Sequence, residues 1–246
     1  MGQVIAIVSG KGGTGKTALT ALIGVALAQQ GKQTLLLDCD VGLRDLDLAL
    51  GMSDRVLMDF SDVIAGRATL AEAAVRHERL KNLWLLTAPV TTDAALAEKD
   101  GMQALLDAVR ARFDVCLVDG GAGLGESFRL ATRCVDRVVV VTTAEPSCLR
   151  DAQRTVMELG GYPDGSVHLI VNRLRRRLLR SLRSNIDDAM DVAGLPLLGV
   201  VPEDEELSAL LAQGRADSFG YYSPARRAAR NIARRLCGER VPLMKL

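Results

Sequence analysis

A glycine-rich segment near the start of the chain has the residue types that bind phosphate. It runs Gly10-Lys11-Gly12-Gly13-Thr14-Gly15-Lys16-Thr17 and fits the pattern G-x-x-x-x-G-K-[ST], between the apolar run Val4–Val8 and the helical pattern Thr17–Gln30. Glycines let consecutive backbone N–H groups curl around phosphate oxygens, and the helix N-terminus adds positive charge. The segment therefore predicts a phosphate-binding loop, with Lys16 against the β- and γ-phosphates and the Thr17 hydroxyl on Mg²⁺.

Three carboxylates follow predicted strands at one edge of the sheet. Asp38 and Asp40 come after the run Thr34–Leu37, and Asp119 follows Val115–Val118. Because ligands bind at the carboxyl ends of the strands in an open α/β sheet, these groups can face a metal–phosphate site. We expect Asp119 to contact Mg²⁺ through its coordinated water and Asp40 to orient the attacking water. Asp38 could hold magnesium-bound water or assist dimer contacts, although acidic loop residues taken alone are more often solvated or capping.

The elements that must position these residues alternate between strands and helices. Apolar runs rich in Val, Ile and Leu predict buried strands at Val4–Val8, Thr34–Leu37, Leu83–Leu86, Val115–Val118, Val138–Thr142, Val167–Val171 and Leu197–Val200. Helical spacing predicts helices at Thr17–Gln30, Lys99–Arg112, Ser147–Leu159, Ser181–Val192, Glu203–Gln213 and Ser223–Leu236. This alternation predicts an α/β fold, a doubly wound and mostly parallel sheet flanked by helices. Since no linker interrupts the pattern, we expect one domain over residues 1–246.

Composition excludes several classes of protein. The chain has 246 residues, 48% hydrophobic and 25% charged, and 31 Lys+Arg against 30 Asp+Glu give a net charge of +1. These values exclude disordered, collagen-like and disulfide-scaffold chains. The five cysteines form no C-x-x-C pair, which indicates reduced thiols. No uninterrupted stretch approaches the roughly 20 apolar residues of a membrane-spanning helix. We therefore expect a cytoplasmic protein.

A second lysine in the loop points to a particular family. The stretch from Lys11 to Thr17 reproduces K-G-G-x-G-K-T and resembles the loop of the deviant Walker A ATPases. The run Gly42–Leu48 resembles the first switch of the MinD branch of that family, which positions the division septum, although Asn is usual where Asp45 stands. This resemblance extends from Val4 to Glu239. It implies a P-loop ATPase with ATP and Mg²⁺ as cofactors, and a homodimer that forms on ATP binding because Lys11 reaches the partner's phosphates.

The resemblance also assigns roles to individual residues. It implies catalytic roles for Lys11, Lys16 and Asp40, and metal contacts for Thr17, Asp38 and Asp119. It implies nucleotide contacts for Lys11, Gly12, Gly13, Thr14, Gly15, Lys16, Thr17 and Ala18, and adenine contacts for Asn172, Pro202 and Asp204. An Asn after a strand is most often a turn residue, which is the alternative for Asn172.

The segment after Asp119 departs from the family pattern. The family more often shows D-[ST]-P-A-G, whereas this chain continues with Gly120-Gly121-Ala122-Gly123. Glycine lacks the φ restriction that proline imposes, so we expect a more flexible second switch. We therefore expect nucleotide binding to survive and hydrolysis to be slow without an activating partner.

The expected function is a spatial regulator of division-site placement, with a Min-type protein as activator or inhibitor. An ATP-dependent interaction module with little turnover, or a ParA-like partitioning switch, stays open as an alternative. The motif Leu149-Arg150-Asp151 matches a family L/V-R-D, for which helix capping is the alternative to partner contact. An iron–sulfur role ranks last because no cysteine closely follows Asp119.

The basic stretches of the sequence do not decide whether the surface binds DNA, binds anionic lipid or is only solvated. Arg173, Arg175, Arg176, Arg177, Arg180 and Arg183 form a run that is usually a solvated face but can attract DNA or anionic lipid. Without interleaved aromatics we expect no sequence-specific nucleic-acid surface. The six residues Val241–Leu246 contain a proline and are too short for the amphipathic membrane helix that relatives carry. Membrane contact, and with it a peripheral position at the inner face of the cell membrane, therefore stays open.

Overall fold

The computed structural model describes residues 1–91, 99–175, 186–218 and 223–244. Its strands are β1 Gln3–Ser9, β2 Thr34–Asp38, β3 Val75–Arg76, β4 Leu83–Leu86, β5 Val115–Ala122, β6 Arg137–Thr142, β7 Val167–Leu174 and β8 Leu197–Pro202. Its helices are α1 Lys16–Gln29, α2 Asp45–Leu50, α3 Phe60–Ile64, α4 Leu70–Ala73, α5 Lys99–Arg112, α6 Glu126–Thr132, α7 Pro146–Glu158, α9 Ile186–Ala193, α10 Glu205–Ala212 and α11 Pro224–Leu236, with a 3₁₀ turn at Ser53–Arg55.

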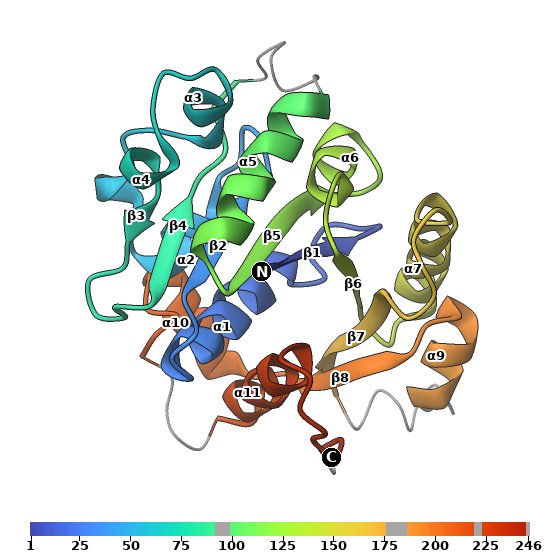
Figure 1. The fold of residues 1–246 in the computed structure, drawn as a ribbon. Coiled ribbons are helices and arrows are strands. Elements are labelled where there is room, and N and C mark those ends of the chain that lie inside the picture. Colours follow the sequence, from blue (N-terminus) through green and yellow to red (C-terminus); the bar gives the residue numbers. More distant parts are fainter. Residues whose placement is uncertain (92–98, 176–185, 219–222, 245–246) are drawn as a thin grey trace.

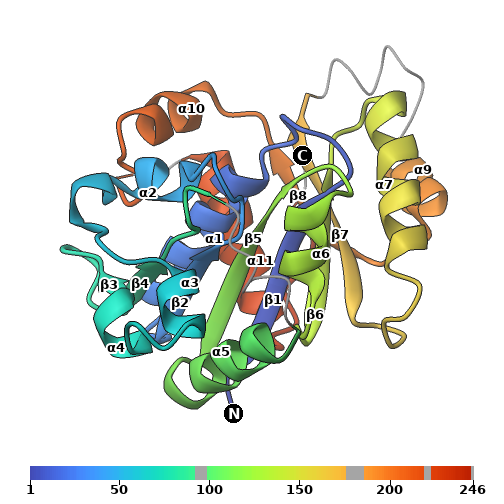
Figure 2. The same ribbon diagram turned by 90° about the horizontal axis from the view of Figure 1, so that it is seen from above.

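The strands form one sheet in the order β3-β4-β2-β5-β1-β6-β7-β8. The pairings are parallel except at the β3 edge, which pairs antiparallel with β4. Helices cover both faces of the sheet (Figures 1 and 2). This architecture confirms the predicted doubly wound, mostly parallel α/β fold.

Two apolar cores lie on opposite faces of the sheet. Side chains alternate along β1, so that Val4, Ala6 and Val8 join the core beneath α5, α6, α7 and α9, whereas Ile5 and Ile7 join the core beneath α1 and α11. Period-two alternation with both faces covered explains why the strand sequences are continuously apolar. Within the ranges given above, no helix has the length and apolarity needed to cross a membrane.

The longer elements match their predicted ranges to within a few residues, whereas the short ones were missed. The sequence pattern predicts no element at α2, α3, α4, α6 or β3. Helices of so few residues show no full apolar period, and capping residues define α3 and α4 instead. Part of the helix predicted at Ser181–Val192 falls on residues 181–185, outside the described residues; α9 accounts for the rest.

The end of β1 packs directly against α7. A Cβ atom at Gly10 would lie 2.5 Å from the carbonyl oxygen of Asp151 and 2.6 Å from Thr155 Oγ1. The Gly10→Ala variant must therefore push helix backbone away, and we expect it to lose about 1–3 kcal/mol of unfolding free energy. Urea denaturation measures the loss, with Gly161→Ala as the control because a Cβ there meets nothing within 4 Å. Equal stability of the two variants would contradict this packing argument.

Candidate functional site

The glycine-rich loop ends in an uncapped helix N-terminus. Helix α1 begins at Lys16, its N-cap Gly15 has φ 89°, and no side chain caps it. The first turn carries no acidic residue, so its backbone N–H groups remain available for an anion. The Thr14 hydroxyl oxygen is buried without a hydrogen-bond partner. An uncapped N-terminus and an unpartnered buried hydroxyl in one loop fit a bound phosphate chain.

Lys16 and Asp40 carry opposite charges at this loop. Lys16 is 7% exposed, and Asp40 is half-buried just beyond β2. Burial raises the pKa of Asp40, and the charge of Lys16 acts in the opposite direction. A lysine held here can pair with phosphate oxygens, and the neighbouring carboxylate can accept a hydrogen bond from water.

Asp38 and Asp119 lie side by side, in register on β2 and β5. Each is 1% exposed, and burial raises the pKa of both, with the Asp119 charge as the second cause for Asp38. Thr20 Oγ1 donates to Asp119 Oδ1 at 2.9 Å, and a hydrogen bond from Thr17 lowers the Asp119 pKa. Two adjacent buried carboxylates favour a bound cation, which offsets their repulsion.

The donor set fits Mg²⁺. Asp38 accepts two backbone hydrogen bonds, from the N–H groups of Asp40 at 2.8 Å and Leu46 at 3.3 Å. Nowhere in the described ranges do three or more His, Cys, Asp or Glu side chains gather as a metal site. Mg²⁺ typically takes one or two carboxylates together with waters and phosphate oxygens, so it needs no larger cluster.

The glycines after Asp119 occupy a strand and not a loop. Strand β5 continues to Ala122, and Gly120 and Gly121 are buried within it. A Cβ atom at Gly121 would lie 2.5 Å from Ser127 Cβ and 3.0 Å from Asp40 Oδ1. At Gly121 the absence of a side chain permits close packing of β5 against α6 and Asp40. The greater flexibility expected of the second switch stays a prediction.

Lys11 lies on the surface at the mouth of the loop. Its Nζ donates to Ser147 Oγ at 3.4 Å, at the start of α7. A cavity of about 270 Å³ adjoins it, lined by Lys11, Gly12, Gly13, Thr14, Thr143, Glu145, Cys148, Arg173, Arg175 and Glu203. Arg175 and Glu203 form an ion pair along its side. Thr143 and Glu145 are not predicted from the sequence because no motif marks them; only their places after a strand end could have drawn attention to them.

The three residues assigned to adenine occupy different surroundings. Asn172 is buried, and its Nδ2 donates to the Thr14 carbonyl at 2.8 Å. Asp204 caps α10 by accepting from the Leu207 N–H at 3.3 Å, and it also accepts from Ser223 Oγ at 2.6 Å. Pro202 ends β8 and is partly exposed. The structure thus brings Asn172 to the phosphate loop and engages Asp204 in capping.

Much of the arginine run lies outside the described residues. Arg173 and Arg175 line the cavity beside Lys11, whereas the described ranges do not include Arg176, Arg177, Arg180 and Arg183.

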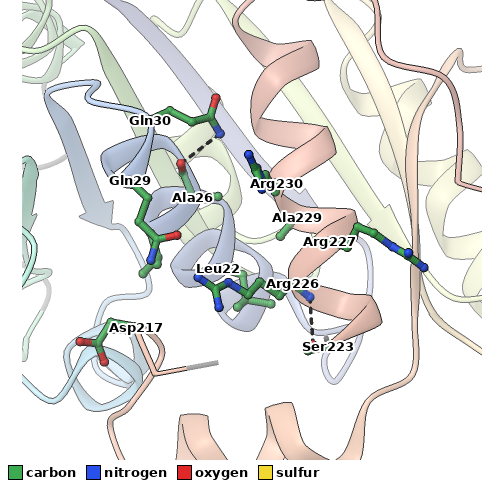
Figure 3. Close-up of a pocket in the computed structure, with 11 residues that line it drawn as sticks. Leu22, Ala26, Gln29, Gln30, Asp217, Ser223, Arg226, Arg227, Ala229 and Arg230 are labelled. Atoms are coloured by element: carbon green, nitrogen blue, oxygen red, sulfur yellow. Dashed lines mark hydrogen bonds between the residues drawn. The ribbon is translucent and has the colours of Figure 1, made fainter. Parts of the chain in front are cut away.

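A separate cavity of about 460 Å³ lies between α1 and α11, away from the loop (Figure 3). Its lining includes the apolar residues Leu22, Val25 and Ala229 and three arginines of α11, Arg226, Arg227 and Arg230. Long basic side chains commonly cover apolar surface in this way.

Comparisons with known proteins settle the family. The model of the CobQ/CobB/MinD/ParA nucleotide-binding domain matches residues 5–217. The chain belongs to this family. The septum site-determining protein MinD of Synechocystis is 37% identical over 99% of this chain and 92% of its own length. The MinD/ParA resemblance, first drawn from the loop residues, is confirmed.

Solved MinD structures share the fold over nearly the whole chain. The MinC:MinD cell division protein complex of Aquifex aeolicus matches with a TM-score of 0.90 and 34% identity, covering 99% of this chain and 98% of that one. The septum site-determining protein MinD of Pyrococcus horikoshii, complexed with Mg-ADP, matches with a TM-score of 0.82 and 31% identity, covering 96% of each chain. These MinD proteins are relatives that the chain resembles over nearly its whole length.

Proposed function

We propose that this chain is a MinD-type ATPase, which binds and hydrolyses ATP with Mg²⁺, dimerises on ATP and regulates the placement of the division site. The observation that carries the proposal is a phosphate loop that ends in an uncapped helix N-terminus, together with the adjacent buried carboxylates Asp38 and Asp119. The MinD relatives support the assignment, including the one complexed with Mg-ADP.

Each residue of the site has its own role in phosphoryl transfer. The loop N–H groups and Lys16 bind and orient the phosphates. Thr17 and Asp119 would hold Mg²⁺ and its waters, and Asp38 would support them. Asp40 orients the attacking water. Bound Mg²⁺ supplies neutralisation of the charge on the phosphates. The adenine contacts of Asn172, Pro202 and Asp204, and the nucleotide contacts of Gly12, Gly13 and Ala18, remain part of this proposal.

A second copy completes the site in this account. Lys11 is exposed at the loop mouth, and we assign it to the phosphates of the partner. The Lys11→Ala variant should bind ATP within about threefold of the native affinity, a loss under 1 kcal/mol, but should no longer dimerise on ATP. Light scattering after size exclusion measures the mass, with Lys32→Ala as the control. If the Lys11→Ala protein still dimerised with ATP, Lys11 would not be needed for contact with the partner's phosphates.

Turnover without a partner is expected to be slow, and a Min-type protein would act as activator or inhibitor. The MinC:MinD complex of Aquifex aeolicus supports a partner of this kind. Phosphate release measured with Mg²⁺, ATP and candidate partners tests whether the chain hydrolyses ATP. Hydrolysis that stays at background under all these conditions would instead favour a nucleotide-dependent interaction module.

A further inference from the structure

Asn172 reaches the phosphate loop from the end of strand β7. Its side chain is 5% exposed, and its Nδ2 donates to the Thr14 carbonyl at 2.8 Å across 158 residues of sequence. A carboxamide has two donor hydrogens and one acceptor oxygen, so this bond uses one donor and leaves Oδ1 for another contact. The partner in this bond is the backbone of the loop itself.

The strand is distorted where it presents this side chain. Arg173 has φ 51°, in the left-handed region, and the register between β7 and β8 shifts between Val171 and Leu174. Left-handed backbone at a non-glycine residue costs free energy and persists only where the surrounding structure enforces it. Strand irregularities near active sites commonly re-aim a side chain. Here the distortion lies directly beside the residue that contacts the loop.

The loop in turn leaves room for the amide. A Cβ atom at Gly15 would lie 2.4 Å from Asn172 Nδ2, and Gly15 has φ 89°. Glycine at this position therefore satisfies both the backbone conformation and the close approach of the amide. In the trans peptide between Thr14 and Gly15, the carbonyl and the following N–H point in opposite directions. A carbonyl fixed toward Asn172 thus fixes the Gly15 N–H on the other side of the loop.

We propose that Asn172 is a positioning residue for the phosphates, which sets the orientation of the Thr14–Gly15 peptide and so aims the loop N–H groups. This inference rests on the proposed nucleotide binding, but it assigns Asn172 an effect on the phosphate chain that does not depend on the base. Loss of the amide leaves the Thr14 carbonyl without its donor and lets the peptide rotate. The phosphate affinity should fall even when no adenine is present.

The test compares ATP with a ligand that has no base. Calorimetry with Mg²⁺ measures the affinities of ATP and of inorganic tripolyphosphate for the native protein, Asn172→Ala and Asn172→Asp. We expect Asn172→Ala to weaken both ligands by the same factor, about tenfold. Asn172→Asp should weaken both further, since a carboxylate then faces a carbonyl. The control Asn231→Ala, on α11, should leave both affinities unchanged.

Two results would overturn the inference: a loss confined to ATP, which would assign Asn172 to the base alone, or no loss for either ligand. Thermal unfolding without ligand checks that each variant folds. The Asp variant keeps the shape of the side chain and decides the matter if the Ala variant is unstable. A native protein that bound neither ligand would reject the proposed function, an outcome distinct from either of these.

Discussion

The Lys16→Ala variant is expected to lose ATP binding by at least about 100-fold, which corresponds to about 3 kcal/mol. Lys16 is 7% exposed at the first residue of α1, and its charge lowers the pKa values of Asp40 and Asp119. Without Lys16, the carboxylates Asp38, Asp40 and Asp119 lie near the phosphates and no buried lysine of the loop offsets their charge. Calorimetric titration with Mg-ATP measures the loss.

The Lys32→Ala variant is the matched control because Lys32 is an exposed lysine after α1, beyond the phosphate loop. Its ATP affinity should equal that of the native chain. Thermal unfolding of the two unliganded variants separates a binding defect from a folding defect. If Lys16→Ala bound ATP as tightly as Lys32→Ala, the assignment of the loop to phosphate would be wrong.

The Asp40→Asn variant should hydrolyse ATP roughly 10²- to 10⁴-fold more slowly, the range for loss of a positioned acid–base group. The amide keeps the shape of the side chain but cannot accept a proton from water. The Asp40 carboxylate lies beside Gly121 of β5 and outside the phosphate loop Gly10–Thr17, so ATP affinity should change little. Single-turnover phosphate release and calorimetry together measure the two quantities.

The Asp54→Asn variant serves as the control for loss of one exposed carboxylate, since Asp54 lies in the 3₁₀ turn Ser53–Arg55. Its hydrolysis rate should match that of the native protein. An Asp40→Asn enzyme with unchanged turnover would exclude Asp40 from the reaction. Equal losses of affinity and turnover would instead indicate that Asp40 maintains the binding site.

The loop and the strand-end carboxylates could be predicted because each signal is local. The glycines, Lys16 and Thr17 lie within the short segment Gly10–Thr17, and Asp119 directly follows the apolar run Val115–Val118. Buried parallel strands leave continuous apolar sequence, so the sheet could also be predicted. Short helices such as α2 and α6 leave no comparable period.

Contacts between distant segments could not be predicted from local pattern. The bond from Asn172 to the Thr14 carbonyl joins β7 to the loop, and the strand is irregular beside it, at Arg173. The close packing at Gly121 depends on Ser127 of α6, a short helix that the sequence pattern does not predict. Both features arise from packing between elements, which local spacing does not record.

Sedimentation velocity of the native protein with Mg-ADP and with a non-hydrolysable ATP analogue tests the central claim most directly. We expect a protomer with ADP and a dimer with the triphosphate, at concentrations where both nucleotides saturate the site. The same protomer mass with both bound nucleotides would contradict it.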